Sequence, residues 1–406
     1  MSLDIMKEST QQKILSNMQL ISALTATIAG ATPGSVTVEN WSDVGDIIAT
    51  GLGPKVFAIG DKFTDTWKDT VAGSSYEFPW RNNCFRSVEL EDGSTVPGMF
   101  LQMAYATPFG AHFSNARAFL RCPSGLAAGT YNVTFGETWG SKDAKANTTW
   151  QFTLTKAVPA GGRLAGFIQM PDTASTSWRV ISYAADGITK LETVSVASGS
   201  EGTSLGTMKL ASRNGDLNSM QETGYGWNRW KTSAIRQYLN SDKKKGQWWT
   251  PQDEWDIAPE QLTTKDGFLC GMPQELLNQI QPVKIVTYTN TVNDGGEADI
   301  TYDKVFLPAL GEMYYEPQIN GEGEPHDYWK ERSGSATKLK QYTAYPNMIT
   351  YAVENHTSAQ FVRLRSASRG IAYSAWFVSS VGYASNDYAW SAPRFSPIVV
   401  ICRKSA

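Results

Sequence analysis

The chain has 406 residues, of which 41% are hydrophobic and 18% charged, which predicts a globular protein of two or three domains and excludes a disordered chain. The net charge of −3 excludes a general attraction for nucleic acid or for an anionic membrane surface. Aromatic residues make up 12% of the chain, and together with 35 Gly they favour short strands and turns over long aliphatic helices.

The cysteines and the apolar runs indicate where the protein is made. Four widely spaced cysteines form no CxxC pair, so buried free thiols are favoured over disulfides at Cys84, Cys122, Cys270 and Cys402. No apolar run approaches the roughly 20 residues of a membrane helix, and the N-terminus lacks the order of a signal peptide. We therefore expect no membrane insertion, no Sec signal peptide and folding in a reducing cytoplasm.

Residues 4–29 predict one helix, within an N-terminal element of residues 1–30 that a linker at 31–55 follows. Apolar and Thr residues repeat with the spacing of a short heptad seam at Ile14, Met18, Ile21, Thr25 and Ile28. A lone helix of this kind is marginal in water. The seam therefore predicts either the stalk of a homo-oligomer, such as a trimer, or a helix docked on its own domain.

Short strands separated by turn signals follow, and residues 56–160 predict an all-β, sandwich-like domain. Within it, Asp92-Gly93 predicts a hairpin, because this pair readily takes the positive φ values of a tight turn. The Pro/Gly-rich segment 158–166 predicts a hinge, so that a second domain covers 161–406. This domain contains an amphipathic helix predicted over 225–241 and a shorter helix over 273–280.

The C-terminal residues 360–406 hold two strand-like ends around a different middle. The ends, 361–364 and 398–401, are β-branched and aromatic. Between them the chain is built from Ala, Ser, Gly, Tyr, Asn, Asp and Trp, which is the composition of an antibody paratope. This pattern predicts a recognition surface held between two core strands.

Five segments in order carry a family resemblance: WNRWKTSAIRQYLNS, DKVFLPALGEMYY, FVRLRSAS, AWFVSSVG and RFSPIVVI. Together they resemble the C-type-lectin-type domain of variable proteins encoded by diversity-generating retroelements, over about Leu164 to Ala406. FVRLRS departs from the family's more usual WWLRS. The resemblance implies an α+β fold, with a C-terminal C-type-lectin-like domain preceded by an all-β, sandwich-like domain and an N-terminal helix.

In that family, template-driven substitution at adenines diversifies residues near the C-terminus, and these residues line a ligand-binding face. The resemblance implies a variable region at about 365–395, with alanines 372, 375, 384, 389 and 392 as scaffold. The ligand-binding role is carried onto Gly370, Ile371, Tyr373, Ser374, Phe377, Ser379, Ser380, Tyr383, Ser385, Asn386, Asp387, Tyr388 and Trp390.

The segments YATPFG and EDGSTVPGMFLQ also resemble proteins of gut-bacterial phages or prophages. The resemblance thus implies a receptor-binding, adhesive protein of a phage tail, present in the virion or in the bacterial cytoplasm before assembly. Its partner would be an unknown protein or glycan on a bacterial surface.

Catalytic and metal-binding patterns are weak. The three histidines have no metal-ligand spacing, and GxSxG, P-loop and GxGxxG motifs are absent. Residues 293–299 and 319–327 carry calcium-type oxygens without the EF-hand order, and turns are favoured there. The basic run 242–246 favours a solvated loop, and Trp248, Trp249 and Trp255 favour core anchoring over sugar stacking. We therefore expect no metal and no cofactor.

Two other functions stay open beside the expected non-enzymatic binding protein. One is an enzyme of the formylglycine-generating type, which has the same broad fold and would need Cys270 and Cys402. The other is a structural phage or surface-layer subunit.

Overall fold

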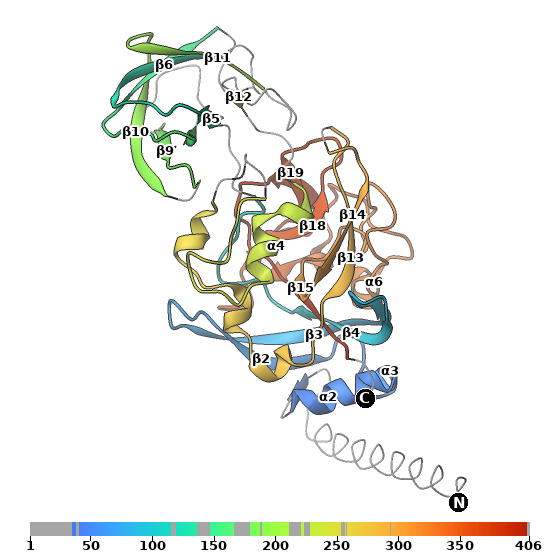
Figure 1. The fold of residues 1–406 in the computed structure, drawn as a ribbon. Coiled ribbons are helices and arrows are strands. Elements are labelled where there is room, and N and C mark those ends of the chain that lie inside the picture. The colour runs from blue at the N-terminus through green and yellow to red at the C-terminus, as the bar shows by residue number, and fades with distance from the viewer. Residues whose placement is uncertain are drawn as a thin grey trace, which may run out of the picture.

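The computed structural model describes residues 35–37, 40–114, 119–135, 147–165, 179–186, 189–210, 221–222, 228–252, 256, 258–292 and 294–403. The helix predicted over 4–29 and its heptad seam lie outside these residues, as does Trp255. The described chain is a β-rich α+β structure with strands in several sheets (Figure 1). Within the described residues, no helix has both the length and the apolar character that crossing a bilayer requires.

A six-stranded sheet joins the two ends of the described chain. Its strands, in sheet order, are β1 (Ser35–Thr37), β2 (Lys62–Lys68), β3 (Ser75–Glu89), β4 (Thr95–Met103), β21 (Ile398–Ile401) and β15 (Val305–Phe306). β1 runs parallel to β2, and the other neighbours are antiparallel. β3 and β4 form the hairpin predicted at Asp92-Gly93, where Gly93 has a φ of +79°.

Two short helices pack against this sheet: α2 (Trp41–Ala49) and α3 (Gly53–Val56). The side chain of Asn40 caps α2 by accepting a hydrogen bond from the Ser42 N–H at 2.8 Å, which satisfies one of its first free donors. Val44, Ile47 and Ile48 recur at helical spacing and are buried. The helix therefore buries one apolar face in the main core.

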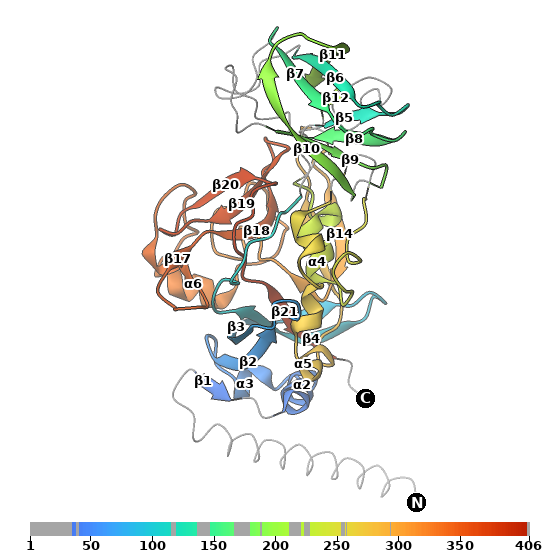
Figure 2. The same cartoon turned by 90° about the vertical axis from the view of Figure 1, so that its left-hand side faces the viewer.

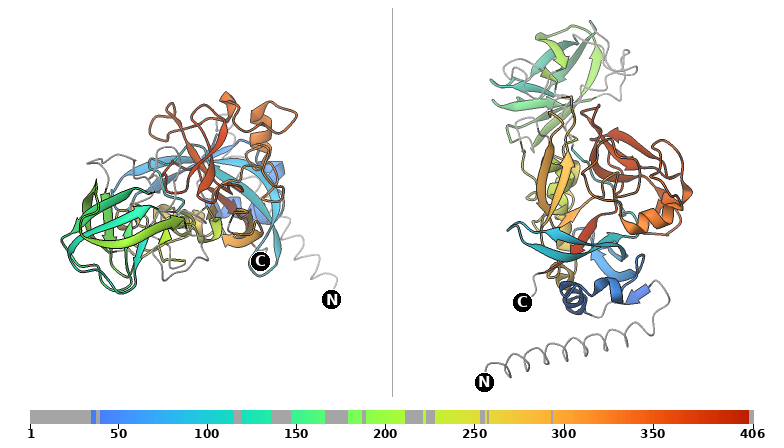
Figure 3. Two further views of the ribbon diagram at one scale, coloured as in Figure 1. Left: turned by 90° about the horizontal axis from the view of Figure 1, so that it is seen from above. Right: turned by 90° about the vertical axis from the view of Figure 1, so that its right-hand side faces the viewer.

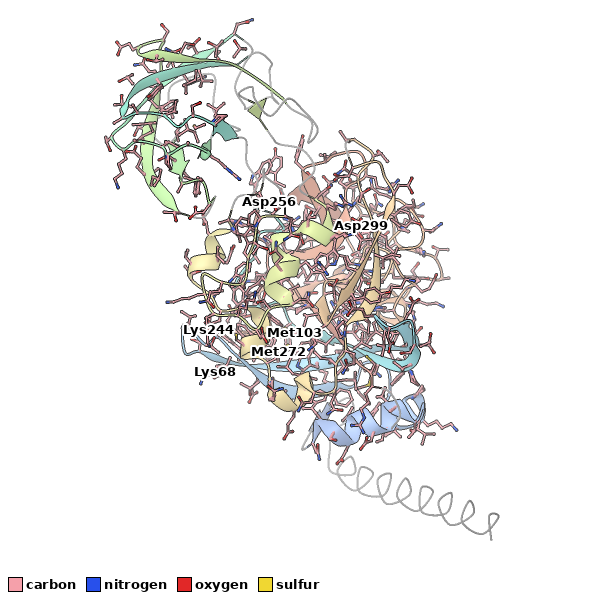
Figure 4. The ribbon with its side chains drawn as sticks, in the orientation of Figure 1. Lys68, Met103, Lys244, Asp256, Met272 and Asp299 are labelled. Atoms are coloured by element: carbon pink, nitrogen blue, oxygen red, sulfur yellow. The ribbon has the colours of Figure 1, made fainter. Side chains whose placement is uncertain are left out.

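A second lobe contains an eight-stranded sheet with a separate core, at the opposite end of the molecule from α2 (Figures 2 and 3). In chain order its strands are β5 (Phe119–Cys122), β6 (Gly129–Phe135), β7 (Thr149–Leu154), β8 (Gly162–Ala165), β9 (Arg179–Tyr183), β10 (Lys190–Ser198), β11 (Thr203–Leu210) and β12 (Gln221–Glu222). Arg163 Nη1 donates a hydrogen bond to the carbonyl oxygen of Asp256, a residue labelled in Figure 4. This contact connects the lobe to the rest of the chain.

The predicted domain boundaries at 56–160 and 161–406 differ from this arrangement. β2, β3 and β4 pair with the C-terminal β21, whereas β5 to β7 pair with strands that follow the predicted hinge. The described residues 158–165 instead make a tight turn into β8, in which Gly161 has a φ of +79°. Pro and Gly favour both hinges and turns, so their presence alone did not distinguish the two.

The remaining elements build the body between the two large sheets. The helical ones are η1 (Trp230–Thr232), α4 (Ala234–Leu239), η2 (Glu260–Thr263), η3 (Phe268–Gly271), α5 (Gln274–Leu277), α6 (Asp327–Ser333) and η4 (Pro346–Met348). The strands are β13 (Val283–Tyr288), β14 (Ala298–Asp303), β16 (Thr350–Tyr351), β17 (Ala359–Gln360), β18 (Val362–Ala367), β19 (Ser374–Val378) and β20 (Ala384–Tyr388).

Both predicted helices of this region are shorter than expected. In place of one helix over 225–241, the described residues form η1 and then α4, which starts after Ser233. The Ser233 hydroxyl oxygen accepts a hydrogen bond from the Arg236 N–H at 3.2 Å, so it caps α4 and interrupts the helix. The helix predicted over 273–280 is α5, which ends at Leu277.

The main core lies between the six-stranded sheet, which includes β21, and the helical elements α4 and η3. Met103 of β4 and Met272 are buried in it (Figure 4), and the rings of Trp67 and Phe268 stack with centroids 5.3 Å apart. Trp248 and Trp249 are buried here as well, as expected for core anchors. Cys84, Cys122 and Cys402 are buried free thiols as predicted, whereas Cys270 is only half-buried.

Candidate functional site

The predicted recognition segment, residues 365–395, forms most of a three-stranded antiparallel sheet and its turns. β19 lies between β18 and β20, so β20 is one of the two edge strands. Of the alanines expected as scaffold, four are buried and the last is exposed: Ala372, Ala375, Ala384, Ala389 and Ala392. Small buried residues let the turns approach the body closely.

Arg363 connects the strands and turns of this segment from its buried side. Its side chain is fully buried, and its guanidinium donates to four backbone carbonyl oxygens: Ala375 at 2.8 Å, Asp387 at 3.2 Å, Tyr388 at 2.9 Å and Ser391 at 3.3 Å. Burial lowers the pKa of Arg363 to about 10, and the nearby Asp387 opposes this. The group thus stays charged at neutral pH and acts as a donor to backbone.

Arg365 fixes the start of the segment through a buried ion pair. Its guanidinium binds both carboxylate oxygens of Glu312, at 2.5 and 2.8 Å, and donates to the carbonyl oxygen of Leu307 at 2.8 Å. Burial raises the pKa of Glu312, but Arg365 outweighs that effect, and the pKa is lowered overall. The pair is one of the strongly bound bidentate kind.

Asn228 fixes the turn that precedes β19. Its Nδ2 lies 2.8–3.0 Å from the carbonyl oxygens of Ser368, Ile371 and Ser374. Its Oδ1 in turn accepts a hydrogen bond from Asn290 Nδ2 at 2.9 Å. The loop 368–374 is therefore held by a buried side chain from a distant part of the chain.

Three aromatic residues form the most distinctive feature of the segment, which we call the aromatic stack: Tyr373, Tyr388 and Trp390. The rings of Tyr388 and Trp390 lie 4.3 Å apart at an interplanar angle of 11°, and Tyr373 lies 6.0 Å from Trp390. Tyr388 is 38% exposed, whereas Trp390 is 9% exposed. Stacking holds the Tyr388 ring in place while leaving part of it open to solvent.

The structure divides the predicted ligand-binding residues by exposure. Those exposed are Gly370, Ile371 and Tyr388; those half-buried are Tyr373, Ser380, Tyr383, Ser385, Asn386 and Asp387; those buried are Ser374, Phe377, Ser379 and Trp390.

The buried members of the predicted set make contacts within the fold. The Ser379 hydroxyl accepts hydrogen bonds from the Val381 N–H at 3.3 Å and the Tyr383 N–H at 3.1 Å, and so shapes the turn between β19 and β20. Phe377 packs between Phe361 and Tyr383. All five residues of β19 are buried, so this part of the paratope-like composition faces the interior on both sides of the strand.

Three exposed apolar residues were missed from the sequence: Tyr342 and Phe361 beside the segment, and Val381 within it. Tyr342 is 62% exposed, packs on Trp376, and its hydroxyl accepts a hydrogen bond from Asn386 Nδ2 at 3.1 Å. Its neighbours in QYTAYP share Tyr and Ala with the predicted surface. That Tyr and Ala content, outside the five segments that carry the family resemblance, was the signal that could have identified it.

The structure shows the surroundings of the residues considered for calcium binding and for thiol catalysis. The acidic residues of the candidate calcium loops make other contacts: Asp299 on β14 (Figure 4) pairs with Arg229 at 2.6 Å, and Glu322 accepts a hydrogen bond from the Tyr288 N–H at 2.9 Å. In the described part of the chain, no three His, Cys, Asp or Glu side chains gather to hold a metal ion. Burial raises the pKa of Cys402 to about 11 and is the main cause that raises the pKa of Cys270.

Comparison with known proteins gives one match. The family described as "Domain of unknown function (DUF6273)" matches residues 205–396, which is less than half of the chain. No curated protein and no solved structure matches this chain. The matched region contains Arg363, Arg365 and the aromatic stack, but it stops short of β21 and excludes β2 to β4.

Proposed function

We propose that this protein is a non-enzymatic ligand-binding protein whose contact surface surrounds the aromatic stack on β20. The observation that carries the proposal is the exposed Tyr388 ring, stacked on Trp390 at an edge strand that buried alanines and Arg363 hold from below. Rigid aromatic residues with a polar rim are typical anchors of protein and glycan recognition. The half-buried Ser385, Asn386 and Asp387 would supply that rim.

We further propose that residues 228–401 form a lectin-type scaffold of the class used by variable proteins of diversity-generating retroelements. The motifs that carry this resemblance contact one another. Arg365 of FVRLRSAS binds Glu312 of DKVFLPALGEMYY, and Asn228 reaches the carbonyl of Ser368. The Arg363 N–H donates to the Arg394 carbonyl of RFSPIVVI at 2.9 Å. Motifs distant in sequence thus belong to one packed unit.

The partner we propose is a protein or glycan on a bacterial surface, with the chain acting in adhesion as part of a phage or prophage tail. This part rests on the sequence resemblance alone. A homo-oligomer built on residues 1–30 would combine several modest sites, and avidity of this kind raises apparent affinity by roughly 10²–10⁴.

Binding is favoured over formylglycine-type catalysis by the state of the two thiols. Catalysis of that type would use Cys270 and Cys402 as thiolates, but burial raises the pKa of each. Cys402 is also fully buried at the end of β21.

The direct test measures binding of the full chain to an array of bacterial surfaces and glycans, with and without Tyr388→Ala. We expect the replacement to weaken binding by roughly thirtyfold, as loss of a hot-spot residue of about 2 kcal/mol does, while the fold survives. Ile300→Ala is the control, because Ile300 is an exposed apolar residue on another sheet. Unchanged binding of Tyr388→Ala to the target would refute the assigned surface.

Diversification is tested separately in the DNA. We expect a nearby imperfect repeat of the codons for residues 365–395 that differs only at adenines, next to a reverse transcriptase gene. Without such a repeat, the diversification part of the proposal fails while the binding part stands.

A further inference from the structure

A cavity of about 220 Å³ lies between the six-stranded sheet and α6, away from the residues 365–395. Its walls come from the start of β2, from β3, from the residues after β4, from α6 and from β16 with the turn that follows. α6 contacts both β3 and η4, and Figure 2 shows α6 beside β17 on the same side of the body. Segments from three separate parts of the chain thus enclose it.

Three cationic side chains line this cavity: Lys62, Arg81 and Arg332. Among the described residues, no carboxylate lines it, and none lies within ion-pair distance of these three cations. The chain as a whole has a net charge of −3, so this group of cations does not follow from a generally basic surface.

Arg81 is the most unusual of the three because it is 4% exposed. Its Nε donates to Asn83 Oδ1 at 3.0 Å and its Nη2 to Gln102 Oε1 at 3.2 Å, and both acceptors are neutral amides. Burial lowers the pKa of Arg81 to about 10, which leaves it charged at neutral pH. A buried charge ordinarily has a counter-charge, and here the protein supplies none among its described residues.

Tyr328 contacts two of these cations. Its ring lies 3.8 Å from the Arg81 guanidinium, and its hydroxyl accepts a hydrogen bond from Arg332. Burial raises the pKa of Tyr328, yet Arg81, Arg332 and Lys62 outweigh burial and lower it overall. Groups that favour a phenolate also favour the negative charge of a ligand.

Aromatic rings form a further part of the wall, next to Ala104, Ile349 and Thr350. Tyr105 and His356 stack with ring centroids 3.9 Å apart at an angle of 6°, and Tyr351 lies beside them. Lys62 Nζ lies 5.8 Å from the Tyr105 ring. Flat ring faces next to fixed cations suit a small molecule that carries an anionic group on a ring.

We propose that this cavity is a binding site for a small oxyanion-bearing ligand, whose phosphate or carboxylate group takes its place among Lys62, Arg81 and Arg332. The site is independent of the proposed face at Tyr388. Phosphate and carboxylate share the chemistry that a cluster of guanidinium and ammonium groups recognises.

The test titrates the full chain with inorganic phosphate and, separately, with glucuronate, by calorimetry at low salt and neutral pH. We expect saturable binding of at least one of them, weakened about tenfold by Lys62→Gln, which corresponds to about 1.4 kcal/mol. The matched control is Lys330→Gln, which makes the same charge change at an exposed residue of α6 outside the cavity.

The two probes distinguish the possible ligand classes. Binding of phosphate alone supports a phosphorylated ligand, and binding of glucuronate alone supports a uronic-acid ligand. Lys62→Arg should keep the affinity within about threefold because it preserves the charge. Absence of saturable binding to either probe, or an equal loss in Lys62→Gln and Lys330→Gln, overturns the proposal. Tyr388→Ala should leave phosphate and glucuronate binding unchanged, so failure here and failure of the proposed function remain distinct.

Discussion

Replacement of Arg365 by Met should destabilise the protein far more than an ordinary lost salt bridge would. The side chains of Arg365 and Glu312 are only 1% and 6% exposed, and the guanidinium also donates to the Leu307 carbonyl. Met fills part of the space but supplies no charge. Glu312 would remain buried beside Glu322 without its cation.

The expected cost is about 3–5 kcal/mol of unfolding free energy, the range for removing one partner of a buried ion pair. The matched control is Arg394→Met, because Arg394 pairs with Glu354 at 2.7 Å but the two side chains are 25% and 38% exposed. A pair of that kind contributes about 0–1 kcal/mol. The same change of residue is thus tested at a buried and at an exposed site.

Urea unfolding at pH 7, followed by tryptophan fluorescence, measures both variants against the unmodified protein. A loss below about 1 kcal/mol for Arg365→Met, or an equal loss for the two variants, would contradict the reasoning.

The pH dependence supplies a second check on the same variant. The folded pKa of Glu312 is depressed, so its contribution is present above the unfolded value of about 4.3 and is lost as the pH falls through the folded pKa. In Arg365→Met the cation is gone and burial raises the Glu312 pKa instead. Protonation then relieves the variant, so its deficit should shrink as the pH falls from 7 towards 4.5.

Two further predictions concern other buried groups. Arg363→Met should cost about 2–4 kcal/mol of unfolding free energy in the same urea assay, because it leaves carbonyl oxygens of β19 and β20 without their charged donor. Asp387→Ala should cost under about 1 kcal/mol, because Arg363 contacts the Asp387 backbone and not its side chain. Similar costs for the two variants would show that the Asp387 side chain matters instead. The native protein should react with at most one equivalent of maleimide within minutes, at the half-buried Cys270, since Cys84, Cys122 and Cys402 are buried; rapid labelling of more than one thiol, read by mass spectrometry, would contradict their burial.

Much of the local structure was predictable because its signals are local. The hairpin at Asp92-Gly93, the strands at the two ends of the C-terminal segment and the buried thiols follow from turn chemistry, β-branched runs and apolar surroundings. The domain organisation was not predictable in this way. The pairing of β21 with β4 joins residues about 300 apart, and periodicity within one strand does not specify its partner.

The candidate sites likewise combine features that the sequence predicted with features that only the fold creates. Composition identified the segment that contains Tyr388, but not which of its residues face outward, because the direction of β19 and β20 decides that. The cationic cavity had no sequence signal. Lys62, Arg81 and Arg332 belong to β2, β3 and α6, and each looks like an ordinary charged residue until the strands and the helix meet.

The contacts that fix the recognition segment also limit which of its positions can vary. Asn228 and Arg363 bind backbone carbonyl oxygens, such as those of Ile371 and Tyr388, and every residue type offers the same acceptor. The side chains of Ile371 and Tyr388 can therefore change without loss of the hydrogen bonds to their carbonyl oxygens. Ser379 differs, because its own hydroxyl accepts the N–H groups of the turn before β20. A diversified surface on this fold would thus change the exposed and half-buried positions and keep the buried ones.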